Sequence, residues 1–204
     1  MPMKQRIAVL VSGGGTNLEA LLQAQEAGKI PHGEIVLVCA SNKDAFALTR
    51  AANHNVPALA IHKKGMSQDD FEAALSRAMT EHRIDFIILA GFLSILTENF
   101  VRAWPRRIIN VHPSLIPSFC GQGMYGLKVH EAALSKGVKV TGATVHYVNE
   151  IPDGGEILLQ KAVDILPEDS AQTLQRRVME QAEWLLLPQA AELVAERLTR
   201  EKGE

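Results

Sequence analysis

Apolar residues follow two alternating patterns along this chain. Some short runs are apolar at every position, which is typical of parallel strands buried between two layers of helices. Between these runs, apolar residues recur every three or four positions, as on the buried face of an amphipathic helix. We expect strands at residues 7–11, 35–40, 58–61, 86–89 and 108–111. We expect helices at residues 18–28, 45–55 and 69–82. This order predicts right-handed crossovers and an α/β, Rossmann-like fold with a mostly parallel sheet and helices on both faces.

The second expected helix has four apolar residues that we assign to its buried face: Phe46, Leu48, Ala51 and Ala52.

The pattern changes after Asn110. Residues 119–126 carry three glycines and predict a loop. A helix is expected at residues 125–136, and two strands at 143–148 and 157–163, joined through Pro152-Asp153-Gly154-Gly155. One long helix from Ser170, kinked at Pro188, completes the expected elements. With no internal repeat or linker, residues 1–204 are interpreted as a single domain.

Composition narrows the functional classes. The 204 residues are 47% hydrophobic and 22% charged, an ordinary globular balance. The formal net charge of -2 gives no basic field for nucleic acid or for an anionic membrane. Cys39 and Cys120 have no ligand-spaced neighbours, so we expect neither a disulfide framework nor a metal site. Only five apolar residues follow residues 1–6, too few for a signal peptide, so a cytoplasmic location is expected.

A glycine cluster at residues 13–15 follows the first strand and opens a helix. Backbone N–H groups and the helix dipole at such a turn form a site for an anion such as phosphate. Leu18 stands where a dinucleotide-binding loop has its third glycine, and residues 40–42 lack the acid that would hold a ribose diol. A phosphate monoester therefore fits better than NAD, and a plain strand-to-helix turn is the alternative.

Polar residues also end the fifth expected strand. Asn110 and His112 are two positions apart, so they face the same side and can converge on one reacting atom. A histidine used in proton transfer commonly needs a carboxylate to orient it. Asp153 or Glu150 could supply that carboxylate, and spacing does not decide between them. His146, on an apolar strand, is either a core residue or a wall of the site.

Several motifs together resemble the folate-dependent formyltransferase family, and the resemblance covers nearly the whole chain. The most specific string is Asn110-Val-His-Pro-Ser-Leu-Ile-Pro117 followed by Asp153-Gly-Gly155. The glycine-rich start is similar to the branch that acts on glycinamide ribonucleotide. The other matching segments are Ser12-Gly-Gly-Gly-Thr-Asn17, Ser41-Asn-Lys43, Leu89-Ala-Gly-Phe92 and Thr144-Val-His146.

The resemblance implies a reaction and its substrates. A formyl group would pass from 10-formyltetrahydrofolate to the amine of 5'-phosphoribosylglycinamide, a step of purine (IMP) biosynthesis. The donor is a co-substrate, and no metal is required. The implied partners are these two small molecules, with no nucleic acid or membrane, and the chain would act as a monomer or homodimer.

The resemblance also implies residue roles. Asn110, His112 and Asp153 would be catalytic, with Asn110 and His112 stabilising the developing oxyanion and Asp153 keeping His112 cationic. The substrate's phosphate and ribose would be bound by Gly15, Thr16, Asn17 and Glu183. The folate would be bound by Leu89, Leu93, Ser94, Ile95, Leu96 and Asn110. Residues up to about 105 would thus form a phosphate-binding half, and residues from about 106 a catalytic and folate-binding half.

The sequence departs from the family pattern at a few positions. Gln68 and Ser94 stand where the family often has basic residues, and the loop 119–126 is longer than usual. Around Glu183 the match slips by one residue.

Three other functions compete with this one. A methionyl-tRNA formyltransferase would need a basic RNA-binding domain after the catalytic domain. A formyl-folate hydrolase would need a regulatory domain before the catalytic domain. A non-catalytic Rossmann-type nucleotide-binding module is the third possibility, and the missing third glycine weighs against it.

Overall fold

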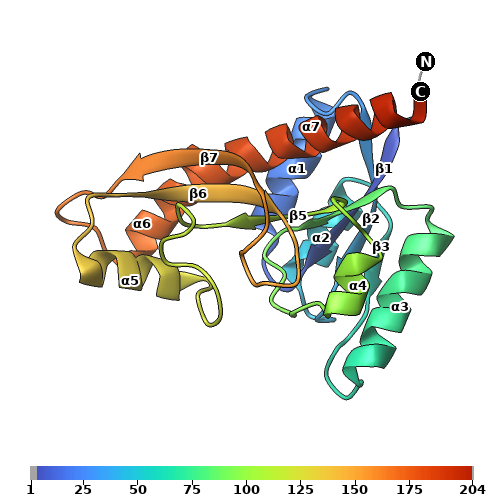
Figure 1. The fold of residues 1–204 in the computed structure, drawn as a ribbon, viewed down its shortest axis with the longest axis horizontal. Coiled ribbons are helices and arrows are strands. Elements are labelled where there is room, and N and C mark those ends of the chain that lie inside the picture. Colours follow the sequence, from blue (N-terminus) through green and yellow to red (C-terminus); the bar gives the residue numbers. More distant parts are fainter. Residues whose placement is uncertain (1–3, 204) are drawn as a thin grey trace.

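One seven-stranded sheet organises the molecule (Figure 1). The computed structural model describes residues 4–203, so residues 1–3 of the N-terminal segment considered above, together with Glu204, lie outside the described residues. The strand order is β3-β2-β1-β4-β5-β6-β7. The strands are β1 (Gln5–Val11), β2 (Gly33–Ala40), β3 (Ala58–Ala60), β4 (Phe86–Leu89), β5 (Ile108–His112), β6 (Val140–Tyr147) and β7 (Ile157–Asp164).

The first five strands are parallel and the last two are not. β1 pairs in parallel with β2 and β4, β2 with β3, and β4 with β5. β6 runs antiparallel to β5, and β7 antiparallel to β6. The prediction of a mostly parallel sheet is therefore confirmed, and the change of direction follows the change of sequence pattern after Asn110.

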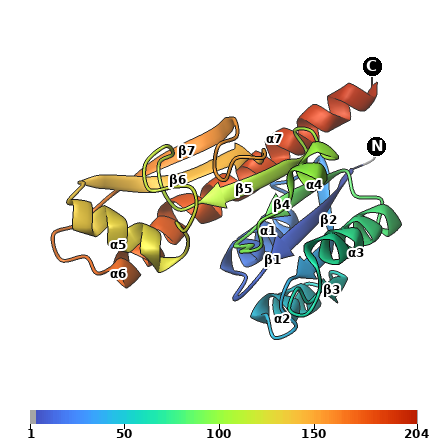
Figure 2. The ribbon, with the colours of Figure 1, turned by 60° about the horizontal axis from the view of Figure 1, so that its bottom comes forward.

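Helices cover both faces of the sheet, as expected for parallel strands that are apolar on both faces. They are α1 (Thr16–Glu26), α2 (Phe46–Asn53), α3 (Gln68–Glu81), α4 (Glu98–Arg102), α5 (Leu127–Lys136), α6 (Ala171–Val178) and α7 (Trp184–Gly203). Alternate strand residues divide between two cores: Val9 and Ile88 pack with α1, α2, α6 and α7, whereas Leu10 and Ile87 pack with α3 and α4. The two views show α7 and α3 on opposite sides of the sheet (Figures 1 and 2).

The predicted buried face of α2 is wrong at two positions. Phe46 is 55% exposed, and Ala52 is exposed as well, whereas Ala47 and Ala51 are fully buried. Small residues face inward because α2 lies close to the glycine loop, where there is no room for a phenyl ring. The Phe46 ring lies instead on the surface, with its centre 5.1 Å from the guanidinium carbon of Arg50.

The C-terminal helix is interrupted. α6 and α7 are joined by a π-helical turn, Met179–Glu183, and Pro188 lies inside α7. Glu183, around which the match to the family pattern slips by one residue, lies at the end of this turn. The short helix α4, which begins at the Thr97 cap, has no counterpart among the predicted elements.

Within residues 4–203, none of the helices has the length and the apolar composition that crossing a membrane requires.

The core facing α7 generates the first prediction. Leu187 is 0% exposed on α7, whereas Leu193 on the same helix is 45% exposed. We expect Leu187→Ala to lower the free energy of unfolding by about 2–5 kcal/mol, because it removes buried methyl groups and leaves a cavity. Leu193→Ala, the matched control, should cost less than about 1 kcal/mol. Urea denaturation measures both, and equal losses would contradict the packing of α7 against the sheet.

Candidate active site

The candidate site lies where the sheet order reverses. β1 and β4 are neighbours whose helical connections leave in opposite directions, and ligands of open α/β sheets bind outside the carboxyl ends of strands at such a point. Three segments follow the carboxyl ends here: residues 12–15 after β1, residues 90–97 after β4, and the loop that follows His112 at the end of β5.

The glycine loop has a geometry that requires glycine at one position. Gly15, the N-cap of α1, has a φ of 71°, and a Cβ there would lie 2.7 Å from Cβ of Ala47. Arg50 Nε donates to the Gly14 carbonyl oxygen over 2.8 Å and so ties the loop to α2. A larger residue at position 15 would force the loop away from α2, so the tight turn depends on this glycine.

The residues around this loop separate into two directions. Asn17 faces the same cavity as His112, and its Nδ2 donates to Glu183 Oε2 over 2.7 Å. Thr16 instead lines a neighbouring hollow with Arg50 and Trp184. The structure therefore brings Asn17 and Glu183 together and places Thr16 beside them on the outer side of α1.

Glu183 is a buried acid. It is 6% exposed, and burial raises its pKa to about 7, although the hydrogen bond from Asn17 acts in the opposite direction. Oδ1 of Asn17 is buried without a hydrogen-bond partner among the described residues. Both residues line the first cavity, and the hydrogen-bonding capacity of the pair is not fully used within residues 4–203.

Asn110 on β5 is paired with a histidine on the adjacent strand β6. The antiparallel register of β5 and β6 pairs Asn110 with His146. Nδ2 of Asn110 lies 3.2 Å from Nε2 of His146, while Nδ1 of His146 lies 2.8 Å from the Tyr147 carbonyl oxygen. Because a carbonyl only accepts, Nδ1 carries the proton, and Nε2 accepts from the Asn110 amide whenever the ring is neutral. His146, which the sequence left open as core or wall, therefore orients Asn110.

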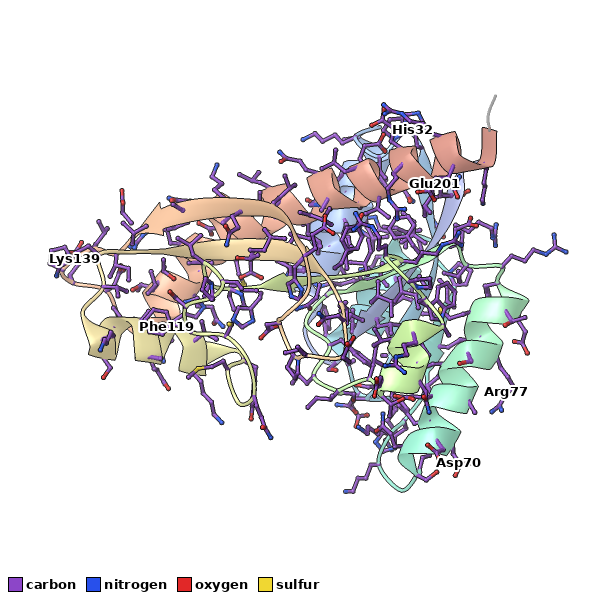
Figure 3. The ribbon with its side chains drawn as sticks, viewed as in Figure 1. His32, Asp70, Arg77, Phe119, Lys139 and Glu201 are labelled. Carbon is purple, nitrogen blue, oxygen red and sulfur yellow. The ribbon has the colours of Figure 1, made fainter. Side chains whose placement is uncertain are left out.

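His112 lies between a carboxylate and a carbonyl. It is 4% exposed; its Nδ1 is 3.4 Å from Asp153 Oδ2, and its Nε2 is 2.9 Å from the carbonyl oxygen of Phe119. The Phe119 carbonyl can only accept, so Nε2 carries a proton. Phe119 lies on the loop before α5 (Figure 3), and this loop therefore covers His112.

Asp153 is the carboxylate that meets both histidines. Its Oδ1 is 3.5 Å from Nε2 of His146, and its Oδ2 accepts from the Gly121 N–H over 2.8 Å. Burial by itself raises the pKa of Asp153, but the neighbouring His146 ring, the charge of His112 and the Gly121 N–H together hold it below its usual value. Asp153 is therefore ionised at neutral pH.

The two alternatives for this carboxylate are thereby separated. Glu150 is exposed and forms no ion pair with His112 within residues 4–203, whereas Asp153 contacts it directly. The turn that carries Asp153 has a φ of 57° at that residue. A Cβ on Gly155 would lie 1.7 Å from the Tyr147 carbonyl oxygen, so the chain approaches β6 closely only with glycine there. The Ile116–Pro117 peptide bond nearby is cis.

Two cavities meet at the catalytic candidates. The first, about 280 Å³, is lined among others by Asn17, Leu93, Asn110, His112, His130, Asp153 and Glu183. The second, about 130 Å³, is lined among others by Leu89, Phe92, Ser94, Ile95, Leu96, Asn110, His146 and Asp153. Asn110 and Asp153 lie in the wall of both. Leu93 is the expected folate residue that faces the first cavity rather than the second.

Residues before and after position 105 contribute to both cavities. Leu89 and Ser94 of the second cavity come from the N-terminal part, and Glu183 of the first comes from the C-terminal helix. No group of three or more His, Cys, Asp or Glu side chains in the described part of the chain is arranged to hold a metal ion.

His130 is a further buried histidine beside the first cavity. It is 0% exposed, and burial, with the charge of His112 adding to it, lowers its pKa to about 4. Its sequence position, in the helix expected after the glycine loop, gave no sign of burial. The packing of α5 against α6 removes it from water.

Sequence alignments with proteins of known name extend over most of this chain. It is 35% identical over 205 residues to "Phosphoribosylglycinamide formyltransferase, chloroplastic" of Arabidopsis thaliana, a match that covers 99% of this chain and 70% of that protein. It is 42% identical to the human "Trifunctional purine biosynthetic protein adenosine-3" over 94% of this chain, which is only 18% of that much longer protein.

Solved structures share the fold. A glycinamide ribonucleotide transformylase from Symbiobacterium toebii superposes with a TM-score of 0.88 at 39% identity, covering 95% of this chain and 88% of that one. A phosphoribosylglycinamide formyltransferase from Brucella melitensis gives a TM-score of 0.86 at 37% identity, covering 94% and 96%. The sequence pattern of the family described as "Formyl transferase" matches residues 5–190, nearly the whole chain. This protein belongs to the formyl transferase family.

Proposed function

We propose that this protein transfers the formyl group of 10-formyltetrahydrofolate to the amine of 5'-phosphoribosylglycinamide, in purine biosynthesis. The observation that carries the proposal is the meeting of two cavities at Asn110 and Asp153, with His112 and His146 on either side. A reaction between two bound small molecules needs this arrangement, because the reacting atoms must meet beside the same groups. The names of the relatives supply the acceptor.

The acceptor fits the first cavity. Its phosphate would lie beyond the edge of this cavity at Asn17, on the glycine loop at Gly15 and Thr16, where the N-terminus of α1 favours an anion. Its ribose would reach Glu183, whose carboxyl group lies beside Asn17. The amine would then point toward Asn110 and His112 at the other end of the cavity.

The donor fits the second cavity. Leu89, Ile95 and Leu96 give it an apolar wall, which suits the flat ring system of a folate, and Asn110 ends the cavity at the catalytic groups. Leu93 is 62% exposed and lies at the border of the first cavity. Ser94 adds a polar side chain to the lining.

The chemistry follows from the groups at the junction. The acceptor nitrogen attacks the formyl carbon on N10, and the carbonyl oxygen becomes an oxyanion. Asn110 Nδ2 and an N–H of His112 donate to that oxygen, where the negative charge develops. When the intermediate breaks down, the C–N10 bond cleaves, N10 gains a proton and the acceptor nitrogen loses one. His112 carries this proton directly or through water.

The residues around His112 prepare it for this role. Asp153 holds the Nδ1 side of the ring, so that Nε2 is left as the donor. In the free protein Nε2 donates to the Phe119 carbonyl. We propose that the formyl oxygen takes the place of that carbonyl, so the loop at residue 119 gives way as the substrates bind.

The implied partners are the two small molecules alone. A cytoplasmic location and a monomeric or homodimeric state remain predictions.

The function is tested by mixing the protein with 10-formyltetrahydrofolate and glycinamide ribonucleotide. We expect the formylated product and tetrahydrofolate in equal amounts. 10-Formyltetrahydrofolate alone should release no formate. Release of formate without the acceptor amine would indicate a hydrolase instead of a transferase. Thermal shifts with each substrate and with NAD complete the test: stabilisation by NAD, and by neither substrate, would indicate a nucleotide-binding module instead.

The catalytic assignment predicts the effect of two substitutions. His112→Ala and Asp153→Ala should each fold normally and lower kcat by about 10²–10⁴-fold, because each removes a group used in charge stabilisation and proton transfer. Asp164→Asn, which changes an exposed carboxylate on β7, is the matched control and should retain wild-type activity. Near-wild-type turnover in either alanine variant would refute the assignment.

Glu183 predicts a pH dependence of stability. Its pKa is about 7 in the folded state against 4.5 for an exposed glutamate, so between these values the unfolded chain releases a proton that the folded chain keeps. The contribution of Glu183 to stability is therefore full below pH 4.5 and is lost as the pH rises through 7.

We expect Glu183→Gln to remove this loss and to be more stable than wild type at about pH 8, by on the order of 2 kcal/mol. Denaturation curves at acid, neutral and mildly alkaline pH measure the difference. Glu180→Gln, at an exposed position in the same π turn, should follow the wild-type curve. If Glu183→Gln also followed that curve, Glu183 would not titrate near neutrality. The same variant should weaken binding of the acceptor, since an amide accepts fewer hydrogen bonds from a ribose.

A further inference from the structure

One wall of the second cavity has no regular secondary structure. Residues 90–97, between β4 and α4, contain neither helix nor strand, yet Ser94, Ile95 and Leu96 line the cavity. Backbone groups in a helix or strand are positioned by their own ladder of hydrogen bonds. In this wall that role must be filled by contacts with other segments.

The beginning of the wall is held by the loop after β1. The Ser12 N–H donates to the Gly91 carbonyl over 3.1 Å, and the Leu93 N–H donates to Ser12 Oγ over 2.9 Å. These contacts fix residues 91–93, which line the first cavity as well.

The end of the wall is held by one carboxylate on α3. Glu72 Oε1 accepts from the Thr97 N–H over 2.6 Å, and its Oε2 accepts from the Thr97 hydroxyl over 2.5 Å. Gln68, one turn earlier on α3, donates through Nε2 to Glu72 Oε1 over 2.7 Å and to the Ile95 carbonyl over 3.0 Å. Asp70, labelled in Figure 3, marks the end of α3 on which these two residues lie.

Glu72 is also placed where a carboxylate is costly unless it is bonded. It is 8% exposed, and the neighbouring Phe71 is 0% exposed and stacks on Phe92 of the wall, with the ring centres 6.4 Å apart. A buried carboxylate is stable only when hydrogen-bond donors satisfy it, and here the donors come from the wall and from Gln68. These hydrogen bonds therefore stabilise the protein only when residues 95–97 are in this position.

We propose that Glu72 is a positioning residue for the formyl donor: its carboxylate fixes the end of the wall at Thr97, and through Gln68 at Ile95, so that residues 94–96 keep the shape of the donor cavity. This inference rests on the proposed assignment of that cavity to the folate. Glu72 touches neither reacting group. It acts on the donor and not on the acceptor, because residues 94–96 line the second cavity and not the first.

The test is a comparison of KM values for the two substrates. Glu72→Ala should raise the KM for the formyl donor about tenfold, with the KM for the acceptor and kcat within about twofold of wild type. Glu72→Gln keeps an oxygen for the Thr97 N–H, and the Thr97 hydroxyl can turn to accept from the new amide. It should therefore recover the donor KM to within about threefold of wild type. Gln68→Ala, which removes only the bond to Ile95 and one bond to Glu72, should raise the donor KM about threefold.

Two controls separate this role from general loss of stability. Leu75→Val makes a small cavity on the same helix at a residue that is 1% exposed, and should lower the melting temperature without changing the donor KM. Glu81→Gln changes an exposed acid at the far end of α3 and should change neither. Binding of tetrahydrofolate by calorimetry should follow the order of the donor KM values.

The inference is overturned if folded Glu72→Ala and Gln68→Ala both keep the wild-type donor KM, if both KM values rise together, or if Leu75→Val gives the same increase. Should Glu72→Ala not fold, Glu72→Gln and Gln68→Ala decide alone. The proposed function fails separately, because then wild type itself neither binds the folate nor forms product.

Discussion

The antiparallel pairing of β6 with β5 is the constraint on which the rest of the site depends. It sets His146 directly opposite Asn110 and sends the chain into the turn that returns Asp153 to His112. Side chains alternate between the faces of a sheet, so a slip of one residue in this register would move His146 to the other face. The parallel half of the sheet supplies much of the cavity walls, but the reversal of direction after β5 brings the candidate catalytic groups together.

The buried carboxylate of Asp153 shows how the protein keeps a charge in such a place. Burial alone would favour the neutral acid, and two histidines with the Gly121 N–H reverse that preference. Glu183 lies on the same cavity with the Asn17 amide as its hydrogen-bond donor, and burial prevails there. The two acids thus have pKa values shifted in opposite directions, because they differ in their hydrogen-bond donors and charged neighbours, and Asp153 keeps its charge to lower pH than Glu183 does.

The two cavities that we propose for the donor and the acceptor are built by different means. The acceptor side begins with a glycine turn fixed by the backbone, in which Gly15 fits closely against Ala47. The donor side depends on an irregular wall fixed by side chains of Ser12 and Glu72. Irregular segments are less stable locally than strands or helices, so they can adjust to a bound ligand. Helix α3, on the face opposite α7, thereby contributes to the wall of the second cavity as well as to the core.

The sequence by itself determined the parallel strands, most of the helices, and the candidate pair of Asn110 and His112, because strand and helix periodicities are local properties; Asp153 was implied only by the family resemblance. It did not determine the inner face of α2, where close packing against the glycine loop favours alanine over Phe46. From the residues alone, Asp153 and Glu150 were equivalent and His146 was undecided. Only the tertiary structure separated them, since contact across antiparallel strands depends on register, and the burial of Glu72 and Glu183 depends on segments that are distant along the chain.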